Sequence, residues 1–333
     1  MQPFAYSRAA SSADAIRRLA ASDGRAKLLS GGTTLYDLMK LGAERPDAII
    51  DINGLSNLAF IEAQDPGGLR LGALARMSDV AADAAVQANY PAIAESLSLA
   101  ASQQLRNMAS LGGNLLQRTR CAYFRAGAPY ACNKRVSGSG CSAIDGIDRG
   151  HALLGGSQDC RAVYPGDFAV ALVAFDASVE LAGPGGTRLL PVESLYREPG
   201  DAPDRDTIIA ADELILAIHV PPAAWAGRST YLKIRDRKSY AFALVSAAVA
   251  LDIAADGTVR EARIALGGVA TRPWRARSAE TLLAGRPLDR AAALAAGEMA
   301  FADARPGRHN AFKIELGRQT VADALMTAAE RNG

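Results

Sequence analysis

The chain has 333 residues, of which 49% are apolar, and its formal net charge is +2. No block rich in lysine or arginine interrupts this near-neutral chain, so we expect no nucleic-acid partner and no anionic membrane surface as a partner. No apolar run approaches the roughly 18 residues of a membrane-spanning helix, so we expect no span. The length predicts two domains, each with a substantial core.

The first third of the chain alternates short strands with helices. Ser12 precedes a helical pattern over residues 13–21, and residues 27–29 form a short apolar strand. This strand leads into Ser30-Gly31-Gly32-Thr33-Thr34, after which helical spacing resumes. A glycine pair at such a point lets the backbone approach a ligand and turn its N–H groups toward phosphate oxygens. An ordinary tight turn explains one isolated pair at least as well, and Gly112-Gly113 carries the same ambiguity.

Residues 117–165 differ from the segments around them. They are rich in glycine, lack hydrophobic periodicity and form an unusually long loop, which is typical of a functional segment. All four cysteines of the chain fall here, at Cys121, Cys132, Cys141 and Cys160. Four thiolates suit a [4Fe–4S] cluster or a structural zinc ion. Because no Cys-x-x-Cys occurs, spacing alone leaves a cluster, zinc and disulfides open.

Other polar side chains accompany these cysteines. His151 lies among them, and we expect it outside the ligand set because four cysteines already suffice. Basic residues of the same segment are expected either to offset the negative charge of a cluster or to form a docking face for a partner. These residues are Arg118, Arg120, Arg125, Lys134, Arg135 and Arg149.

Regular structure returns after the cysteine segment. Asp167 is placed to cap a helix over residues 168–175, and residues 213–220 read as a strand that ends at two prolines. We predict the domain boundary just beyond them, giving domains over 1–224 and 225–333. The second domain reads as three antiparallel strands followed by three helices, with a hairpin turn at Asp256-Gly257.

Short motifs occur in order along nearly the whole chain. The first covers residues 27–35, the second covers residues 104–115, and two more cover residues 231–246 and 266–275. Together they resemble the FAD-binding subunit of the molybdenum hydroxylases, the family of xanthine dehydrogenase and aldehyde oxidoreductase. The resemblance implies an α+β fold, in which a two-lobed FAD-binding domain of the vanillyl-alcohol-oxidase type precedes a smaller domain of a three-stranded antiparallel sheet with helices.

The resemblance also implies which residues bind the cofactor. The first turn would wrap the FAD pyrophosphate, and the second would form the opposite wall. Asp167 matches a position facing the cofactor, and Lys233 matches one near the isoalloxazine, where a cation stabilises reduced flavin. A helix cap and a solvated strand lysine are their plain structural alternatives. The full set is Lys27, Leu28, Leu29, Ser30, Gly31, Gly32, Thr33, Thr34, Leu35, Ser110, Gly113, Asn114, Asp167 and Lys233.

The cysteine segment is similar to an insertion in the FAD subunit of bacterial periplasmic aldehyde oxidoreductases. This similarity implies a [4Fe–4S] cluster held by Cys121, Cys132, Cys141 and Cys160. It further implies that the chain has no catalytic residue of its own. A molybdenum-cofactor subunit would oxidise an aldehyde, and a [2Fe–2S] subunit would pass the electrons through FAD to an external acceptor.

Two other functions remain open from the sequence. One is a stand-alone flavin oxidase, and the other is a non-enzymatic scaffold whose cysteine loop holds zinc or disulfides. The compartment is open as well. Residues 1–8 lack the apolar region of a signal peptide, so we expect either a periplasmic location, reached by co-export with a signal-bearing partner, or a cytoplasmic one.

Overall fold

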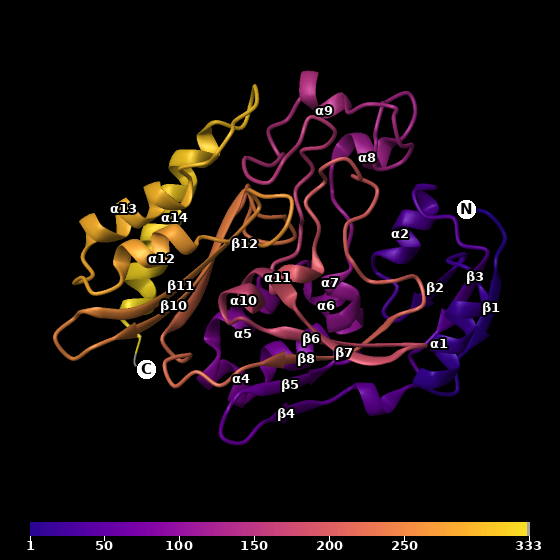
Figure 1. Ribbon diagram of the computed structural model, residues 1–333, viewed down its shortest axis with the longest axis horizontal. Coiled ribbons are helices and arrows are strands. Elements are labelled where there is room, and N and C mark those ends of the chain that lie inside the picture. Colours follow the sequence, from indigo (N-terminus) through magenta and orange to yellow (C-terminus); the bar gives the residue numbers. More distant parts are fainter. Residues whose placement is uncertain (332–333) are drawn as a thin grey trace.

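The computed structural model describes residues 1–331, which pack around three hydrophobic cores. An N-terminal lobe, a second lobe and a C-terminal domain surround these cores, and an insertion projects beyond them (Figure 1). Both N-terminal lobes and the C-terminal domain mix strands with helices, which confirms the predicted α+β class. Within the described residues, no helix is both long enough and apolar enough to cross a bilayer.

The N-terminal lobe is a three-stranded parallel sheet with two helices. Its strands, in the order β1-β3-β2, are β1 (Ala5–Arg8), β3 (Ala48–Asp51) and β2 (Ala26–Leu29). Parallel neighbours need crossovers, which α1 (Ser12–Ala21) and α2 (Leu35–Lys40) provide. The cap of α1 is Ser11 rather than the predicted Ser12, because the Ser11 side chain accepts the hydrogen bond from the Asp14 N–H at 3.1 Å.

The second lobe is a five-stranded antiparallel sheet covered by helices. Its strands, in spatial order, are β4 (Ile61–Ala63), β5 (Leu69–Gly72), β8 (Leu214–Val220), β6 (Ser178–Gly183) and β7 (Gly186–Pro191). The helices are η1 (Ser56–Leu58), α3 (Met77–Ala82), α4 (Ala84–Asn89), α5 (Pro91–Ser98), α6 (Gln103–Met108), α7 (Leu111–Leu115), α10 (Phe168–Ala174) and α11 (Val192–Leu195). Every residue of α10 is buried, which makes this helix the centre of the largest core.

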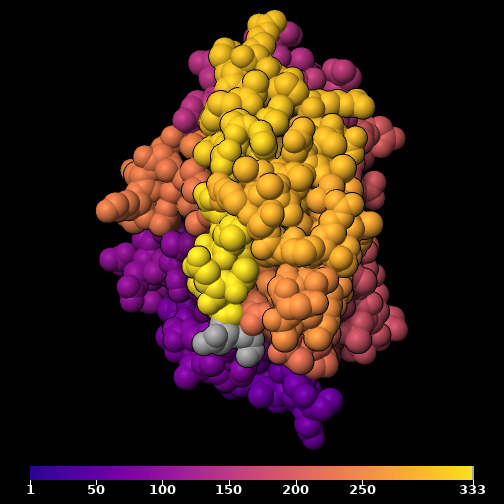
Figure 2. Space-filling view, turned by 90° about the vertical axis from the view of Figure 1, so that its left-hand side faces the viewer, coloured from indigo at the N-terminus to yellow at the C-terminus, as the bar shows by residue number. Residues whose placement is uncertain are grey.

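The C-terminal domain is an antiparallel sheet with helices on one face. Its strands, in spatial order, are β12 (Trp274–Arg275), β11 (Val259–Gly267), β10 (Val245–Ile253) and β9 (Ser229–Ile234). The sheet has four strands instead of the predicted three, because Trp274 and Arg275 pair with Leu266 and Ala265. The helices α12 (Arg277–Leu283), α13 (Arg290–Ala300) and α14 (Phe312–Ala329) complete the domain and form much of the face in Figure 2.

The insertion over residues 117–165 lies at the top of Figure 1. It is irregular apart from the short helices α8 (Ala122–Ala126) and α9 (Ser142–Asp145). Its residues 117–152 contribute nothing to the three hydrophobic cores of the described chain. Residues 117–152 are therefore held mainly by polar contacts, whereas Leu153, Leu154 and Tyr164 join the cores.

Candidate functional site

A cavity of about 1600 Å³ lies between the two N-terminal lobes and reaches the C-terminal domain. Part of its lining is apolar and belongs to the core of the N-terminal lobe, including Leu19, Ile52 and Leu214. Another part comes from the segment after β9, where Tyr240 and Phe242 present aromatic rings. An elongated ligand with apolar and polar parts suits such a lining.

The first glycine turn lies between β2 and α2, as predicted, and contacts the second lobe directly. A Cβ atom on Gly31 would lie 1.9 Å from the carbonyl oxygen of Met108, so only glycine permits this approach. Gly32 has φ +71°, a left-handed conformation that favours glycine. The turn therefore brings its backbone against the segment that leads into the second turn.

The second glycine turn is held by hydrogen bonds. Ser110 caps α7, with its Oγ accepting from the Gly113 N–H at 3.3 Å. The Gly112 N–H donates to the Ala73 carbonyl oxygen at 2.8 Å. Ser110 is buried, so its hydroxyl serves the fold as well as facing the cavity.

Most of the predicted cofactor residues meet at this cavity. Two of the predicted set, Leu29 and Lys233, do not line it. The residues that do are Lys27, Leu28, Ser30, Gly31, Gly32, Thr33, Thr34, Leu35, Ser110, Gly113, Asn114 and Asp167. The Ser30 Oγ and Asn114 Oδ1 atoms are buried without a protein hydrogen-bond partner. Buried polar atoms in native proteins normally have partners, so these two fit a polar ligand such as FAD.

Asp167 and Lys233 form a buried ion pair. The Lys233 ammonium lies 2.7 Å from Asp167 Oδ2, and the Tyr231 hydroxyl donates to Oδ1 at 2.7 Å. Burial raises the pKa of the Asp167 carboxyl, and the Lys233 ammonium opposes that shift. Asp167 stands at the N-terminus of α10 as predicted, but its side chain makes no capping bond. Lys233 faces Asp167 rather than solvent, so the solvated-lysine alternative is wrong.

The four cysteines surround one small void inside the insertion. Cys132 and Cys141 face each other across an isolated antiparallel bridge, and all four cysteines are free thiols. Burial raises the pKa of Cys121 to about 11 and also raises the pKa of Cys160. Such thiols stay protonated at neutral pH, and a bound metal would release their protons.

The cysteines do not form a compact single-ion site. Among residues 1–331, no three His, Cys, Asp or Glu side chains meet closely enough to hold one metal ion. A [4Fe–4S] cluster distributes its ligands over four irons, so the thiolates surround the group. The all-cysteine donor set around one void fits that arrangement, with Cys121, Cys132, Cys141 and Cys160 as the residues that would hold it.

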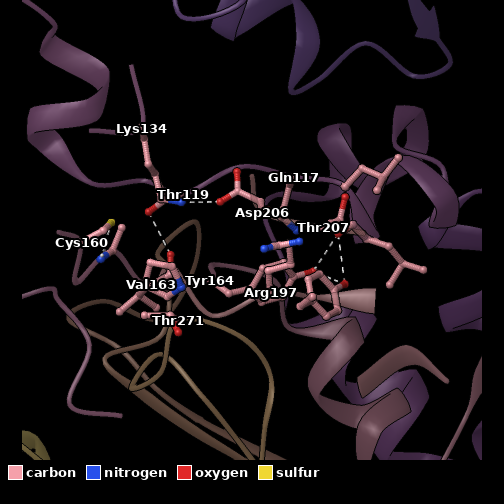
Figure 3. Close-up of a pocket in the computed structure, with 15 residues that line it drawn as sticks. Gln117, Thr119, Lys134, Cys160, Val163, Tyr164, Arg197, Asp206, Thr207 and Thr271 are labelled. Atoms are coloured by element: carbon pink, nitrogen blue, oxygen red, sulfur yellow. Dashed lines mark hydrogen bonds and ion pairs between the residues drawn. The ribbon is translucent and has the colours of Figure 1, made fainter. Parts of the chain in front are cut away.

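The basic residues of the insertion bind to the rest of the chain. Arg118 bridges Glu44 and Asp206, each at 2.8 Å. Figure 3 shows that Lys134 also reaches Asp206. Arg120 and Arg125 share Asp37 of α2, Arg149 pairs with Asp236, and Arg135 donates to the Phe124 and Leu41 carbonyls. Four carboxylates of the same chain thus pair with five of these cations. These pairings weaken both expectations for the basic residues, that they offset the negative charge of a cluster and that they form a free docking face for a partner.

A chamber of about 270 Å³ lies between the cysteine void and the large cavity. Cys121 and His151 line both the chamber and the void. Arg120, Asp167 and Phe242 line both the chamber and the large cavity. The Arg120 guanidinium lies over the Phe242 ring, 5.0 Å from its centre. The two predicted sites are therefore neighbours.

Two parts of the cavity lining carried little sequence signal. Residues 204–215 line it, although this stretch contains no motif. Tyr240 also lines it and has φ +52°, a conformation that non-glycine residues rarely adopt. Strained residues of this kind cluster at ligand sites, but a φ angle is not visible in a sequence.

Two protein-family models together match almost the whole chain. Residues 2–223 match the FAD binding domain in molybdopterin dehydrogenase, and residues 202–328 match the CO dehydrogenase flavoprotein C-terminal domain. The predicted boundary at 224–225 lies close to the end of the first match and stays a prediction. The matched fold and the glycine-lined cavity define a class of protein, the flavoproteins of molybdenum-dependent dehydrogenases.

Individual relatives cover almost the whole chain. The aldehyde oxidoreductase FAD-binding subunit PaoB of Escherichia coli (strain K12) is 45% identical over 98% of this chain and 99% of its own length. The xanthine dehydrogenase FAD-binding subunit of Escherichia coli O157:H7 is 26% identical over 90% of this chain and 86% of its own. A solved structure of carbon monoxide dehydrogenase from Hydrogenophaga pseudoflava, which lacks the Mo-pyranopterin moiety of the molybdenum cofactor, superposes with a TM-score of 0.77 at 27% identity and covers 100% of both chains.

The chain belongs to the family of FAD-binding subunits of the molybdenum hydroxylases, the oxidoreductases that include aldehyde and xanthine dehydrogenases. The family resemblance inferred from the sequence motifs is confirmed, and so is the fold class. Membership in an oxidoreductase family leaves the non-enzymatic scaffold without support.

Proposed function

We propose that this chain is the electron-transfer subunit of a heteromeric molybdenum-dependent aldehyde oxidoreductase and that it holds both FAD and a [4Fe–4S] cluster. Electrons would arrive from a [2Fe–2S] subunit, after a molybdenum-cofactor subunit has oxidised the aldehyde, and leave to an external acceptor. The relative at 45% identity, named as the FAD-binding subunit of an aldehyde oxidoreductase, supports the choice of aldehyde.

One observation carries the proposal: a single chamber adjoins both the glycine-lined cavity and the cysteine void. Arg120 lines the large cavity, and the next residue, Cys121, lines the void. FAD exchanges electrons singly or in pairs, and a cluster exchanges one at a time. Two such groups held in adjoining pockets of one chain suit a relay of electrons.

The protein's own residues would position the two groups. The Ser30–Thr34 turn and the segment around Ser110 and Asn114 would hold the dinucleotide through backbone N–H groups and the unpartnered Ser30 Oγ and Asn114 Oδ1. Asp167, whose carboxylate is fixed by Lys233 and Tyr231, would face the flavin end. Lys233 would then act on the cofactor through Asp167 rather than by direct contact.

Cofactor analysis of the protein purified anaerobically from its native host tests the proposal. We expect one FAD, four irons and four acid-labile sulfides per chain. Cys121→Ser should remove iron and the broad visible absorbance of a cluster while FAD remains. Ser137→Ala is the matched control, since Ser137 is an exposed residue of the same insertion. One zinc per chain, or no metal, would contradict the cluster.

The stand-alone flavin oxidase makes the opposite kinetic prediction. If this chain alone met the organic substrate, aldehyde would bleach its flavin without any other subunit. We expect the purified single subunit to hold FAD and yet leave aldehydes untouched, with turnover restored by the [2Fe–2S] and molybdenum subunits. Bleaching by aldehyde in the single subunit would overturn the proposal.

We propose that the chain is periplasmic by co-export with a signal-bearing partner or, failing that, cytoplasmic, because residues 1–8 lack the apolar region of a signal peptide. Fractionation of host cells that express all three subunits, compared with cells that lack the signal-bearing one, distinguishes the two. Loss of this chain from the periplasm in the second strain supports co-export.

A further inference from the structure

His151 lies beside the cysteine void, and no part of the proposed function uses it. Its Nε2 atom is 3.2 Å from the Sγ of Cys121, within hydrogen-bonding distance for sulfur. The residue is buried, with 6% of its surface exposed. Its other ring nitrogen, Nδ1, is buried with no hydrogen-bond partner. The imidazole therefore makes one polar contact through its ring, and that contact is to a predicted cluster ligand.

The main chain of His151 is fixed from the C-terminal domain. Its carbonyl oxygen accepts from Asn310 Nδ2 at 3.2 Å and from Lys313 Nζ at 3.3 Å. Its N–H donates to the Asp148 carbonyl oxygen at 2.8 Å. The Asp148 carboxylate in turn accepts the backbone N–H groups of residues 308 and 309. Contacts on both sides of the residue thus hold the ring toward Cys121.

The direction of the ring contact follows from the chemistry of a bound thiolate. A cysteine sulfur that ligates iron has no hydrogen to donate and can only accept. The contact in a cluster-loaded protein therefore requires the proton on Nε2. Hydrogen bonds to the sulfurs are one of the factors that set the reduction potential of an iron–sulfur cluster.

We propose that His151 is a positioning residue of the cluster site, whose Nε2–H donates a hydrogen bond to the Sγ of Cys121 and raises the reduction potential of the cluster. The inference rests on the proposed function, because it requires the cluster to be present. Reduction adds one electron, supplied by reduced flavin, and the Cys121–iron bond and the His151 proton stay in place. The added charge spreads onto the sulfurs, so the bond is stronger in the reduced state.

Redox titration of the purified complex, followed by the electron paramagnetic resonance of the reduced cluster, tests the inference. His151→Phe keeps a ring of similar size but removes the donor. We expect the equilibrium constant for reduction to fall roughly tenfold, which for a one-electron couple is a shift of about 59 mV to lower potential. His151→Gln retains an N–H donor and should show a smaller shift.

Two controls separate this effect from general damage. His219→Gln alters a histidine in β8 that pairs with Glu180, outside the cysteine void, and should leave the cluster potential unchanged. The FAD potential should stay constant in all three variants. Iron and sulfide contents should remain at the wild-type level in both His151 variants.

Each other outcome overturns the inference. An unchanged cluster potential in His151→Phe removes the hydrogen bond as a determinant. Loss of iron in both His151 variants makes the residue a ligand or a support of the fold instead. If wild-type protein lacks four irons and sulfide, the proposed function itself is wrong. That result differs from a protein that holds the cluster but whose cluster potential does not depend on His151.

Discussion

Gly31→Ala would separate the two glycine turns that frame the large cavity. The new Cβ would lie 1.9 Å from the Met108 carbonyl oxygen and 2.7 Å from its carbon. Real contacts of this kind are at least about 3.0 Å long, so the two backbone segments must move apart by roughly 1 Å. Overpacking of this size costs about 1–3 kcal/mol.

That strain should appear mainly as a loss of cofactor affinity. The turn can relax outward in the empty protein, but a bound dinucleotide requires both turns in place. Since each 1.4 kcal/mol is a factor of ten, we expect FAD to bind about tenfold to a hundredfold more weakly. Titration of flavin-free protein with FAD, followed by flavin fluorescence, measures this change.

Gly54→Ala is the matched control. A Cβ on Gly54 meets nothing within 4 Å, and its φ is not positive. We expect its FAD affinity to stay within about twofold of wild type, because no contact is disturbed. If Gly31→Ala also binds FAD with unchanged affinity, the close contact between the turns does not shape the cofactor site, and the reasoning is refuted.

Three further predictions concern charged side chains. Lys233→Met leaves Asp167 buried without its ion-pair partner, so urea titration should show a loss of about 3 kcal/mol or more; a change under 1 kcal/mol would contradict this. Asp37→Asn releases Arg120 and Arg125, so limited proteolysis should cut residues 117–165 several times faster, and an unchanged rate would show that these ion pairs do not hold the insertion in place. Burial lowers the pKa of Lys313 from 10.5 to about 8. The unfolded chain then binds more protons between these values, so the free energy of unfolding should rise from pH 8 to 10, relative to Lys313→Met, by about 2 kcal/mol; a constant difference would disprove it.

Local signals predicted the elements around the cofactor cavity well. The strand, glycine turn and helix over residues 26–40 appear as expected, because hydrophobic spacing and turn residues act over a few positions. The hairpin at Asp256-Gly257 likewise joins β10 to β11. Both cases depend on neighbours in sequence, and sequence patterns report neighbours directly.

Such local signals do not predict which strands and side chains pair when they are far apart in the sequence. The strand β8 lies between β5 and β6, although 30 residues separate it from β6 along the chain. Asp167 was placed correctly at the start of a helix, but its carboxylate turns to Lys233, which is 66 residues away. Capping propensity describes the backbone position, whereas burial and a distant ammonium decide the side-chain partner. The place of residues 204–215 at the cavity could not be predicted for the same reason, since only the folded chain brings that segment there.

The ion pairs of the insertion have a consequence for how the protein matures. Cys121 to Cys160 are synthesised before Asp206, Asp236 and Lys313, whose side chains fasten the insertion to the rest of the molecule. The pairings of the insertion with Glu44 and Asp37 can form earlier, so a growing chain carries four partly anchored thiols until nearly all of it has left the ribosome. If the chain holds the proposed cluster, iron and sulfide would then be delivered after the C-terminal helix is complete, late in the assembly of this subunit.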